Sequence, residues 1–277
     1  MDDTAPRAFA LVGPGRAGTA VALALRDAGW RPVAVAGRSP DAPSATRLAA
    51  RLDAPTAPVE TVARGASLVV LATPDASIDD AARAIVPALV DGALVIHLAG
   101  ARGLDALAPI AETRPNVQAG ALHPLQTLPE GADGSTLAGA WAAVAGPDTV
   151  GELALALGLR PFRVDDAHRA RYHAAACVAS NHLVALLGQV ERLAAAADVP
   201  LAAFAPLVRA TVDNVCEHGP RASLTGPVAR GDTATLAAHL DAVPADEHDA
   251  YRALAREVHR LSERDDAELA ALLETKP

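Results

Sequence analysis

Three glycines in the segment GPGRAG could hold the phosphates of a dinucleotide. Gly13, Gly15 and Gly18 follow the spacing G-x-G-x-x-G. In that pattern the first glycine makes a tight turn, the second lets the backbone approach a pyrophosphate, and the third allows close packing of a helix on a strand. The intervening Arg16 and Ala17 would open the helix, whose N-terminus attracts phosphate. A plain glycine turn is the alternative, because the pattern alone is weak evidence.

The end of the next apolar run bears on which dinucleotide would bind. The run closes with AGRSP, so Arg38 and Ser39 occupy the place where NAD enzymes usually carry an acidic residue for the ribose hydroxyls. Arginine can pair with a 2′-phosphate, and serine can donate a hydrogen bond to it. We therefore expect NADP(H) as the cofactor, with an ordinary surface turn as the alternative.

Residues just after other apolar runs could contact the cofactor or take part in the reaction. Ligands of open α/β sheets bind beyond the carboxyl ends of the strands. Thr73 and Pro74 follow one such run and are expected at the cofactor. His123 ends another run, and a histidine that titrates near neutral pH could donate a proton beside a nicotinamide. A histidine that only caps a strand is the alternative, and His97, inside an apolar run, is expected to be packed.

Polar residues in the second half of the chain could bind a substrate. His173, Cys177 and Asn181 recur every four residues, so they share one face of a helix. The Asn181 amide could orient a carbonyl group, and His173 could contact the substrate, whereas Cys177 is expected to pack. In the segment LTGPVARGD, Thr225 and Arg230 could hold a carboxylate. The alternative for the helix face is a polar stripe inside a helical bundle. The alternative for LTGPVARGD is a helix boundary.

The first half of the chain alternates strand-like and helix-like segments that would position these residues. Apolar runs typical of buried strands occupy residues 8–13, 32–38, 67–73, 93–100, 117–124 and 140–146. Helical patterns between them cover residues 17–29, 44–53 and 78–89. Strands buried on both faces and separated by helices predict an α/β fold, a Rossmann-type doubly wound parallel sheet.

The second half has a helical pattern throughout. Helices are expected at residues 167–197, 201–217, 233–240 and 245–273, the first of them capped by Asp165 or Asp166. We therefore expect a dinucleotide-binding domain at residues 1–160 and an all-helical domain for substrate binding and dimerisation at residues 161–277. The apolar character of the long helix favours a homodimer.

Composition excludes several classes of function. A formal net charge of −9 without any basic run argues against nucleic-acid binding. Two cysteines without metal-ligand spacing predict neither a disulfide framework nor a metal site. No apolar stretch is long enough for a membrane span, so a cytoplasmic protein is expected. The single lysine is Lys276, which leaves no plausible catalytic lysine.

The motifs together resemble a known group of proteins. GPGRAG, ATPD, LHPLQT, a helix with Ser180 and Asn181, and LTGPVARGD are similar to bacterial proteins that join a Rossmann-like domain to a helical C-terminal domain of unknown function. The resemblance spans nearly the whole chain. It extends to ketopantoate reductase, prephenate dehydrogenase and pyrroline-5-carboxylate reductase, in the 6-phosphogluconate dehydrogenase-like superfamily.

The resemblance implies a reaction. A His-Pro pair supplies the catalytic histidine of prephenate dehydrogenases, which implicates His123. Ketopantoate reductases carry a lysine four residues before the asparagine of the long helix, and that position here is Cys177. The expected function is NADPH-dependent reduction of a small carboxylate-bearing carbonyl compound, with 2-dehydropantoate (ketopantoate) as the leading substrate. An imine reductase of the pyrroline-5-carboxylate type and a non-catalytic NADP(H)-binding sensor are the alternatives.

Overall fold

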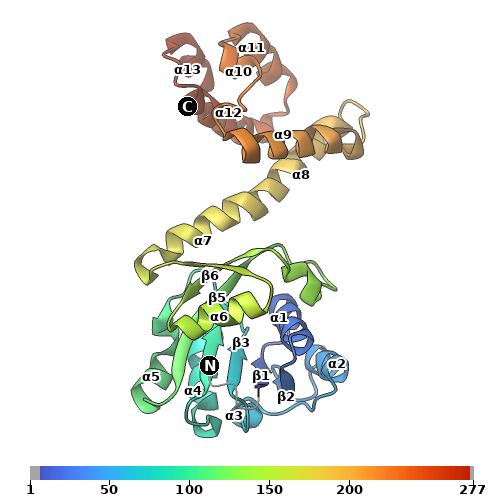
Figure 1. The fold of residues 1–277 in the computed structure, drawn as a ribbon. Helices are drawn as coiled ribbons and strands as arrows, with labels where there is room; N and C mark the ends of the chain where they lie inside the picture. Colours follow the sequence, from blue (N-terminus) through green and yellow to red (C-terminus); the bar gives the residue numbers. More distant parts are fainter. Residues whose placement is uncertain (1–6, 275–277) are drawn as a thin grey trace. The chain divides into compact units, whose positions relative to one another are not determined.

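The chain folds into two compact units that divide between Ser180 and Asn181 (Figure 1). The computed structural model describes residues 7–274, so Lys276 lies outside the described residues. The first unit contains the whole β-sheet and the second is helical. This confirms the expected combination of a Rossmann-type sheet with a helical C-terminal part. The expected domain boundary after residue 160 stays a prediction.

The first unit is built on a sheet of seven strands. The strands run in the order β2-β1-β3-β4-β5-β6-β7, and their bounds are β1 (Ala8–Val12), β2 (Arg31–Ala36), β3 (Leu68–Leu71), β4 (Leu94–His97), β5 (Gln118–Leu125), β6 (Trp141–Ala145) and β7 (Arg160–Arg163). Neighbouring strands are parallel except for β5 and β6, which are antiparallel. The expectation of a parallel sheet is therefore confirmed for β1 to β5, wrong for the direction of β6, and incomplete because β7 was not foreseen.

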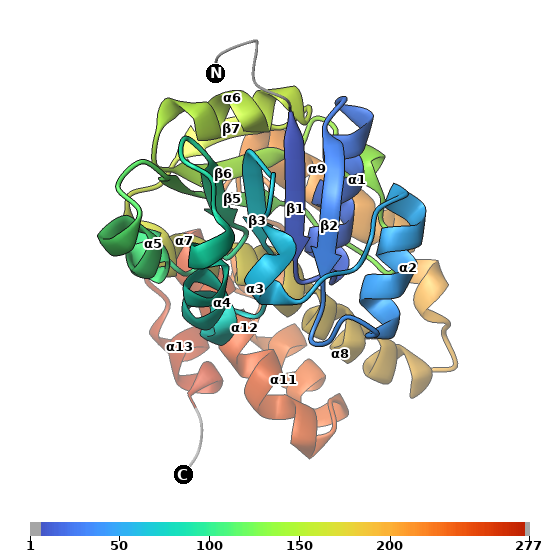
Figure 2. The ribbon, with the colours of Figure 1, turned by 90° about the horizontal axis from the view of Figure 1, so that it is seen from below.

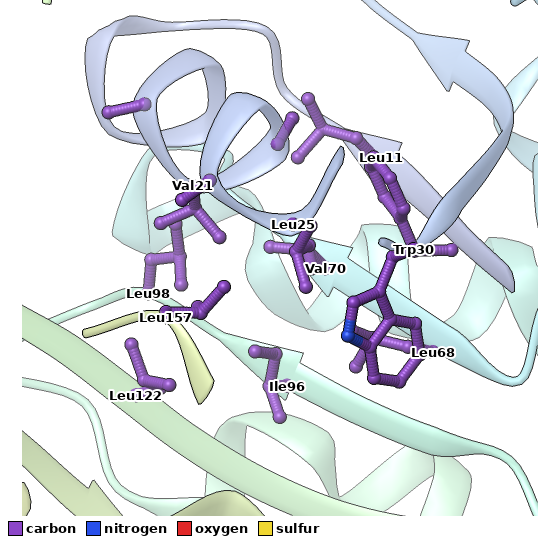
Figure 3. Close-up of a cluster of buried hydrophobic side chains, with 14 of the residues drawn as sticks. Leu11, Val21, Leu25, Trp30, Leu68, Val70, Ile96, Leu98, Leu122 and Leu157 are labelled. Carbon is purple, nitrogen blue, oxygen red and sulfur yellow. The ribbon is translucent and has the colours of Figure 1, made fainter. Parts of the chain in front are cut away.

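Helices cover both faces of the sheet (Figure 2). Successive strand residues point to opposite faces, so Phe9 and Leu11 join one core cluster while Ala10 and Val12 join the other. The first cluster, part of which Figure 3 shows, contains residues of α1 (Arg16–Asp27), α2 (Pro43–Leu52) and α6 (Asp148–Ala156). The second contains residues of α3 (Val59–Val62), α4 (Ile78–Ile85) and α5 (Ala108–Thr113).

The turn between β1 and α1 lies where the strand order reverses. The chain passes from β1 to β2 on one side and then returns to β3 on the other side of β1. Gly13 has a φ of 96°, and a Cβ atom there would lie 2.5 Å from the carbonyl carbon of Ala72. A Cβ atom on Gly18 would lie 2.2 Å from the Gly13 oxygen. Glycine at these positions therefore allows the turn to pack directly against the end of β3.

A long helical run leads out of the first unit. It consists of α7 (Arg169–Cys177), a π-helical turn (Val178–His182) and α8 (Leu183–Ala195). The helix expected over residues 167–197 is thus present, but the π-helical turn interrupts its regular spacing. The expectation that Asp165 or Asp166 caps this helix is wrong. Asp165 makes no side-chain cap bond, and the Asp166 carboxylate accepts from the backbone N–H of Leu104 at 2.8 Å.

The second unit continues with five more α-helices among the described residues. Their bounds are α9 (Ala205–His218), α10 (Pro227–Arg230), α11 (Thr233–Ala242), α12 (His248–Ser262) and α13 (Ala267–Leu273). The helix expected over residues 245–273 is interrupted after Ser262, where Glu263 has a φ of 53° and Asp266 caps α13. Within residues 7–274, no helix combines the length and the apolar character that crossing a membrane requires.

Candidate functional site

The predicted site residues of the first unit gather at the carboxyl edge of its sheet. Gly13 follows β1, Thr73 follows β3, and His97 ends β4. His123 lies near the end of β5, where its ring meets the first turns of α7. Since β1, β3, β4 and β5 are parallel, their carboxyl ends share one edge.

The β1–α1 turn has the features of a phosphate cradle. A Cβ atom added at Gly15 would meet no heavy atom within 4 Å, so the protein leaves open space there. Helix α1 begins at Arg16, with Ala17 in its first turn, and it has neither a side-chain cap nor an acidic residue in that turn. Its free N–H groups and positive dipole end are therefore available to an anion.

The loop after β3 adds an unpartnered hydroxyl to this cradle. The Oγ1 atom of Thr73 is buried and has no hydrogen-bond partner within the described part of the chain. Thr73 directly follows Ala72, against which Gly13 packs, and Pro74 then begins a short 3₁₀ turn. A buried hydroxyl without a partner is rare in folded proteins and indicates that a ligand or water completes it. These residues fit the pyrophosphate of a dinucleotide.

Arg38 and Ser39 lie just beyond the end of β2, as expected. Both side chains are exposed. Ser39 forms a hydrogen bond that lowers the pKa of the Asp41 carboxyl below its ordinary value, so its hydroxyl already has a partner. Arg38 makes no salt bridge among the described residues, which leaves it as the free cation of this loop.

His97 is a packed histidine, as its position in an apolar run predicted. Its side chain is fully buried, and its Nδ1 accepts from the backbone N–H of Ala99 at 3.2 Å. The proton therefore lies on Nε2, which donates to the carbonyl oxygen of Gly103 at 3.0 Å. Burial lowers the pKa of His97 to about 4.

His123 forms a hydrogen bond with a residue that the sequence analysis did not single out. Its Nδ1 lies 2.8 Å from the hydroxyl oxygen of Tyr172 on α7. Burial raises the pKa of Tyr172 to about 12, so the hydroxyl keeps its proton and donates to Nδ1. Burial, together with electrostatic repulsion that includes the positive charge of Arg169, lowers the pKa of His123 to about 4. At neutral pH the ring is therefore neutral and carries its proton on Nε2.

The Nε2 atom of His123 packs against the backbone at Gly100, where any side chain would clash with the imidazole rings. A Cβ atom on Gly100 would lie 2.9 Å from this nitrogen and 2.4 Å from Cδ2 of His173. The two imidazole rings are 5.8 Å apart and nearly perpendicular. His173 and Cys177 also lie near each other, with 3.9 Å between Nδ1 and Sγ, which confirms the four-residue spacing on α7. The structure thus brings His123 and His173 together.

Arg169 is the second residue that the sequence analysis missed. Its side chain is fully buried, and its Nη1 donates to the carbonyl oxygen of Ala99 at 3.4 Å. A signal was present in the sequence, because Arg169, Tyr172 and His173 are spaced i, i+3 and i+4 and so share one helix face. Because His173 was already a candidate, the shared face would have marked Arg169 and Tyr172 as further candidates, although not which residues they contact.

The remaining predicted residues belong to the second unit. Asn181 is exposed and lies in the π-helical turn, a rare geometry that is frequent at functional sites. Thr225 precedes α10, and Arg230 is the last residue of that helix. The nearby Asp232 accepts from the backbone N–H of Thr235 and so caps α11. The roles of Asn181, Thr225 and Arg230 in binding a substrate stay predictions.

Two protein-family models match separate parts of the chain. Residues 4–124 match a Rossmann-like domain, and residues 142–258 match a domain of unknown function, DUF2520. The chain thus carries a Rossmann-like domain followed by a DUF2520 domain, which confirms the resemblance drawn from the motifs. No protein of curated function matches the sequence.

Several solved structures share the fold. A Bacteroides fragilis protein, provisionally assigned as an NADP oxidoreductase, superposes with a TM-score of 0.77 at 23% identity, over 92% of this chain and 98% of the other. An imine reductase from a Pseudomonas species gives 0.63 at 19% identity, over 97% and 99%. Plasmodium falciparum pyrroline carboxylate reductase with NADP bound gives 0.63 at 13% identity, over 98% and 99%. At these identities the likeness is one of fold.

The substitution Gly15→Ala should weaken cofactor binding and leave the stability of the fold unchanged. The protein has room for the added methyl group, so the free energy of unfolding should stay within about 0.5 kcal/mol of the original value. A pyrophosphate approaching the backbone would meet the methyl group, so the Kd for NADPH should rise by about tenfold or more. Fluorescence titration of NADPH measures this. Gly151→Ala, in α6 with equally open surroundings, is the control and should leave the Kd unchanged. If Gly15→Ala binds NADPH with unchanged affinity, the β1–α1 turn is not part of the cofactor site.

The two buried histidines predict a loss of stability in mild acid. Their pKa values of about 4 in the folded protein lie below the ordinary 6.5, so the unfolded chain takes up protons first as the pH falls. The free energy of unfolding should decrease from about pH 6.5 towards pH 4, by up to roughly 1.4 kcal/mol per pH unit for each histidine. Urea titrations between pH 5 and 7 measure this slope. His97→Gln and His123→Asn should each remove about half of it, and a slope that neither variant changes would contradict the assignment.

Proposed function

We propose that this chain, in which a DUF2520 domain follows a Rossmann-like domain, is an NADPH-dependent oxidoreductase that reduces a small carboxylate-bearing carbonyl compound. The observation that carries the proposal is the neutral His123, whose Nε2 proton lies at the same sheet edge as the phosphate cradle. The NADP-bound pyrroline carboxylate reductase of similar fold supports a nicotinamide cofactor. Arg38, exposed and without a salt bridge among the described residues, supports NADPH over NADH. Ketopantoate is the leading substrate.

The residues of the first unit would supply a proton to the developing alkoxide. NADPH, when bound, supplies the hydride that reduces the carbonyl carbon. His123 donates a hydrogen bond from Nε2 to the carbonyl oxygen and gives up that proton as negative charge develops on the oxygen. Tyr172 passes its hydroxyl proton to Nδ1 as Nε2 loses its own. When solvent reprotonates Nε2, Nδ1 returns its proton to the tyrosine oxygen, which restores both groups. A neutral imidazole can polarise a carbonyl in this way when its tautomer is fixed.

The residues of the second unit would orient the substrate. We assign the Asn181 amide to the carbonyl group, because an amide both donates and accepts. Thr225 and Arg230 would contact the substrate carboxylate. His173, whose ring packs against Gly100 beside His123, would contact the substrate.

Reduction of an imine is the second candidate. The low pKa of His123 favours it, because a protonated imine needs hydride but little acid catalysis, and the chain has no lysine near Asn181 to act as a donor. A third candidate, a sensor that binds NADP(H) without turnover, would use the cradle alone. Fold does not distinguish these functions, since the site determines the reaction.

The second unit also supports the expected homodimer. Val184 and Leu186 on α8, and Leu207 and Val212 on α9, are exposed, with 69% of Val184 and 64% of Leu207 accessible. No residue of α9 is buried in the single chain. We propose that a second copy covers these apolar side chains. Light scattering should give the molar mass of two chains, and Val184→Asp together with Leu207→Asp should reduce it to one. A wild-type protein with the mass of one chain would contradict the dimer.

The reaction is tested by following NADPH oxidation with ketopantoate, other 2-oxo acids and cyclic imines, with NADH in parallel. Saturable turnover of a 2-oxo acid with NADPH preferred is the expected result. His123→Asn should then lower kcat by about a hundredfold or more, because the donor is lost. Tyr172→Phe should lower kcat by about tenfold, because the tautomer of His123 is no longer fixed.

Tyr251→Phe is the matched control for Tyr172→Phe. Tyr251 forms the same kind of bond, 2.7 Å from its hydroxyl to Nδ1 of His239, but in the second unit. This variant should keep the original kcat. If His123→Asn keeps most of the activity towards a cyclic imine, the imine reductase is favoured. If NADPH binds tightly and no compound is turned over, the sensor is favoured.

A further inference from the structure

Arg169 leaves hydrogen-bond donors unused in the interior of the first unit. Its side chain is fully buried, yet Nε and Nη2 have no hydrogen-bond partner within the described part of the chain. Among the described residues of this unit, the other buried side-chain atom without a partner is Oγ1 of Thr73. Both lie at the carboxyl edge of the sheet, so the unused polar atoms of the unit occur where the proposed reaction takes place.

Asp166 compensates the charge of Arg169 only in part. One carboxylate oxygen lies 3.4 Å from Nε without the alignment of a hydrogen bond, and the other accepts from the backbone of Leu104. The Asp166 side chain is also 46% exposed, which weakens its attraction through solvent screening. A buried guanidinium with free N–H groups is costly, because it has lost its hydration without gaining acceptors.

The neighbours of Arg169 add no negative charge. His97 and His123 have lowered pKa values, partly because of the Arg169 charge, and so are neutral at neutral pH. Tyr172 keeps its proton because burial raises its pKa to about 12. Apart from Asp166, the residues around the guanidinium therefore supply no anion, and a planar carboxylate is the ligand that its paired N–H groups fit best.

The backbone places this guanidinium next to the proton donor. Arg169 binds the carbonyl oxygen of Ala99, and Nε2 of His123 packs against the next residue, Gly100. One peptide unit thus separates the two groups. A carboxylate held by Arg169 would bring the adjacent carbon of the same molecule towards His123.

We propose that Arg169 binds the carboxylate of the substrate, and that the substrate is a 2-oxo or 2-imino acid whose reacting carbon is bonded directly to that carboxylate. This inference rests on the proposed function. It gives the chain a carboxylate ligand in the first unit, in addition to the Arg230 of the second unit. Neutral carbonyl compounds are poor substrates on this account, because they leave the guanidinium without an acceptor.

Kinetics of Arg169 variants test the proposal with a 2-oxo acid and its amide. Arg169→Lys keeps the charge but not the paired donors, and should raise KM for the acid by about tenfold. Arg169→Met should raise it by about a hundredfold or more. KM for the amide should change little in either variant. Arg114→Met, which alters an arginine bound to backbone carbonyls and Asp91 at the end of α5, is the control. Equal losses for acid and amide, or an unchanged KM for the acid, would overturn the proposal.

Calorimetric binding of oxalate tests the same site without turnover. The wild-type protein should bind oxalate and Arg169→Met should not. Asp166→Asn removes the partial counter-charge while keeping an oxygen for Leu104, so it should bind oxalate several-fold more tightly, an effect opposite to that of structural damage. Arg169-dependent oxalate binding without turnover of any compound would reject the proposed function and keep the anion site. The anion site would be rejected if Arg169→Met turned over the 2-oxo acid as the wild type does. It would also be rejected if a folded Asp166→Asn variant bound oxalate more weakly.

Discussion

The hydrogen bond of 2.8 Å between the Tyr172 hydroxyl and Nδ1 of His123 determines where the proton of this imidazole lies. Burial keeps Tyr172 protonated and keeps His123 neutral, so the tyrosine donates and the remaining ring proton is on Nε2. The absence of a side chain at position 100 lets this nitrogen pack closely against the backbone of the loop that follows β4. A surface histidine would exchange between both tautomers and a cation, and it would not present one donor in one direction.

The rest of the carboxyl edge supports this donor. His97 is neutral as well, with its proton held on Nε2 by the backbone of Ala99 and Gly103. The segment that follows β4 is bound to the turn before α7 through Asp166, whose carboxylate accepts from the backbone N–H of Leu104. Arg169 is then the one cation buried among these groups in the described part of the first unit, and its free donors give the cluster its affinity for an anion. Positioning and electrostatics of this kind are what a protein contributes when the cofactor supplies the reactive group.

Sequence alone predicted the features that depend on local patterns. The strands β1 to β5, the glycine turn and the packed His97 follow from apolar runs and from glycine spacing, which neighbouring residues in the chain determine. The antiparallel direction of β6 and the presence of β7 depend on pairing between distant segments, which periodicity does not report. The partners of His123 were missed for a related reason. Tyr172 lies 49 positions away, and only the folded chain shows that it meets the end of β5. Asp166 was expected to cap a helix, but its carboxylate accepts from the backbone of Leu104, which lies 62 positions away.

The protonation of His123 is the central claim, and nitrogen NMR of the histidine rings measures it most directly. Labelled wild-type protein would be titrated between pH 3 and pH 8, with His123→Asn used to assign the signals. We predict that His123 remains neutral down to about pH 4, with its proton on Nε2 throughout the neutral range, and that Tyr172→Phe mixes the two tautomers. A His123 ring that protonates near its ordinary pKa of 6.5, or one that carries its proton on Nδ1, would contradict the account.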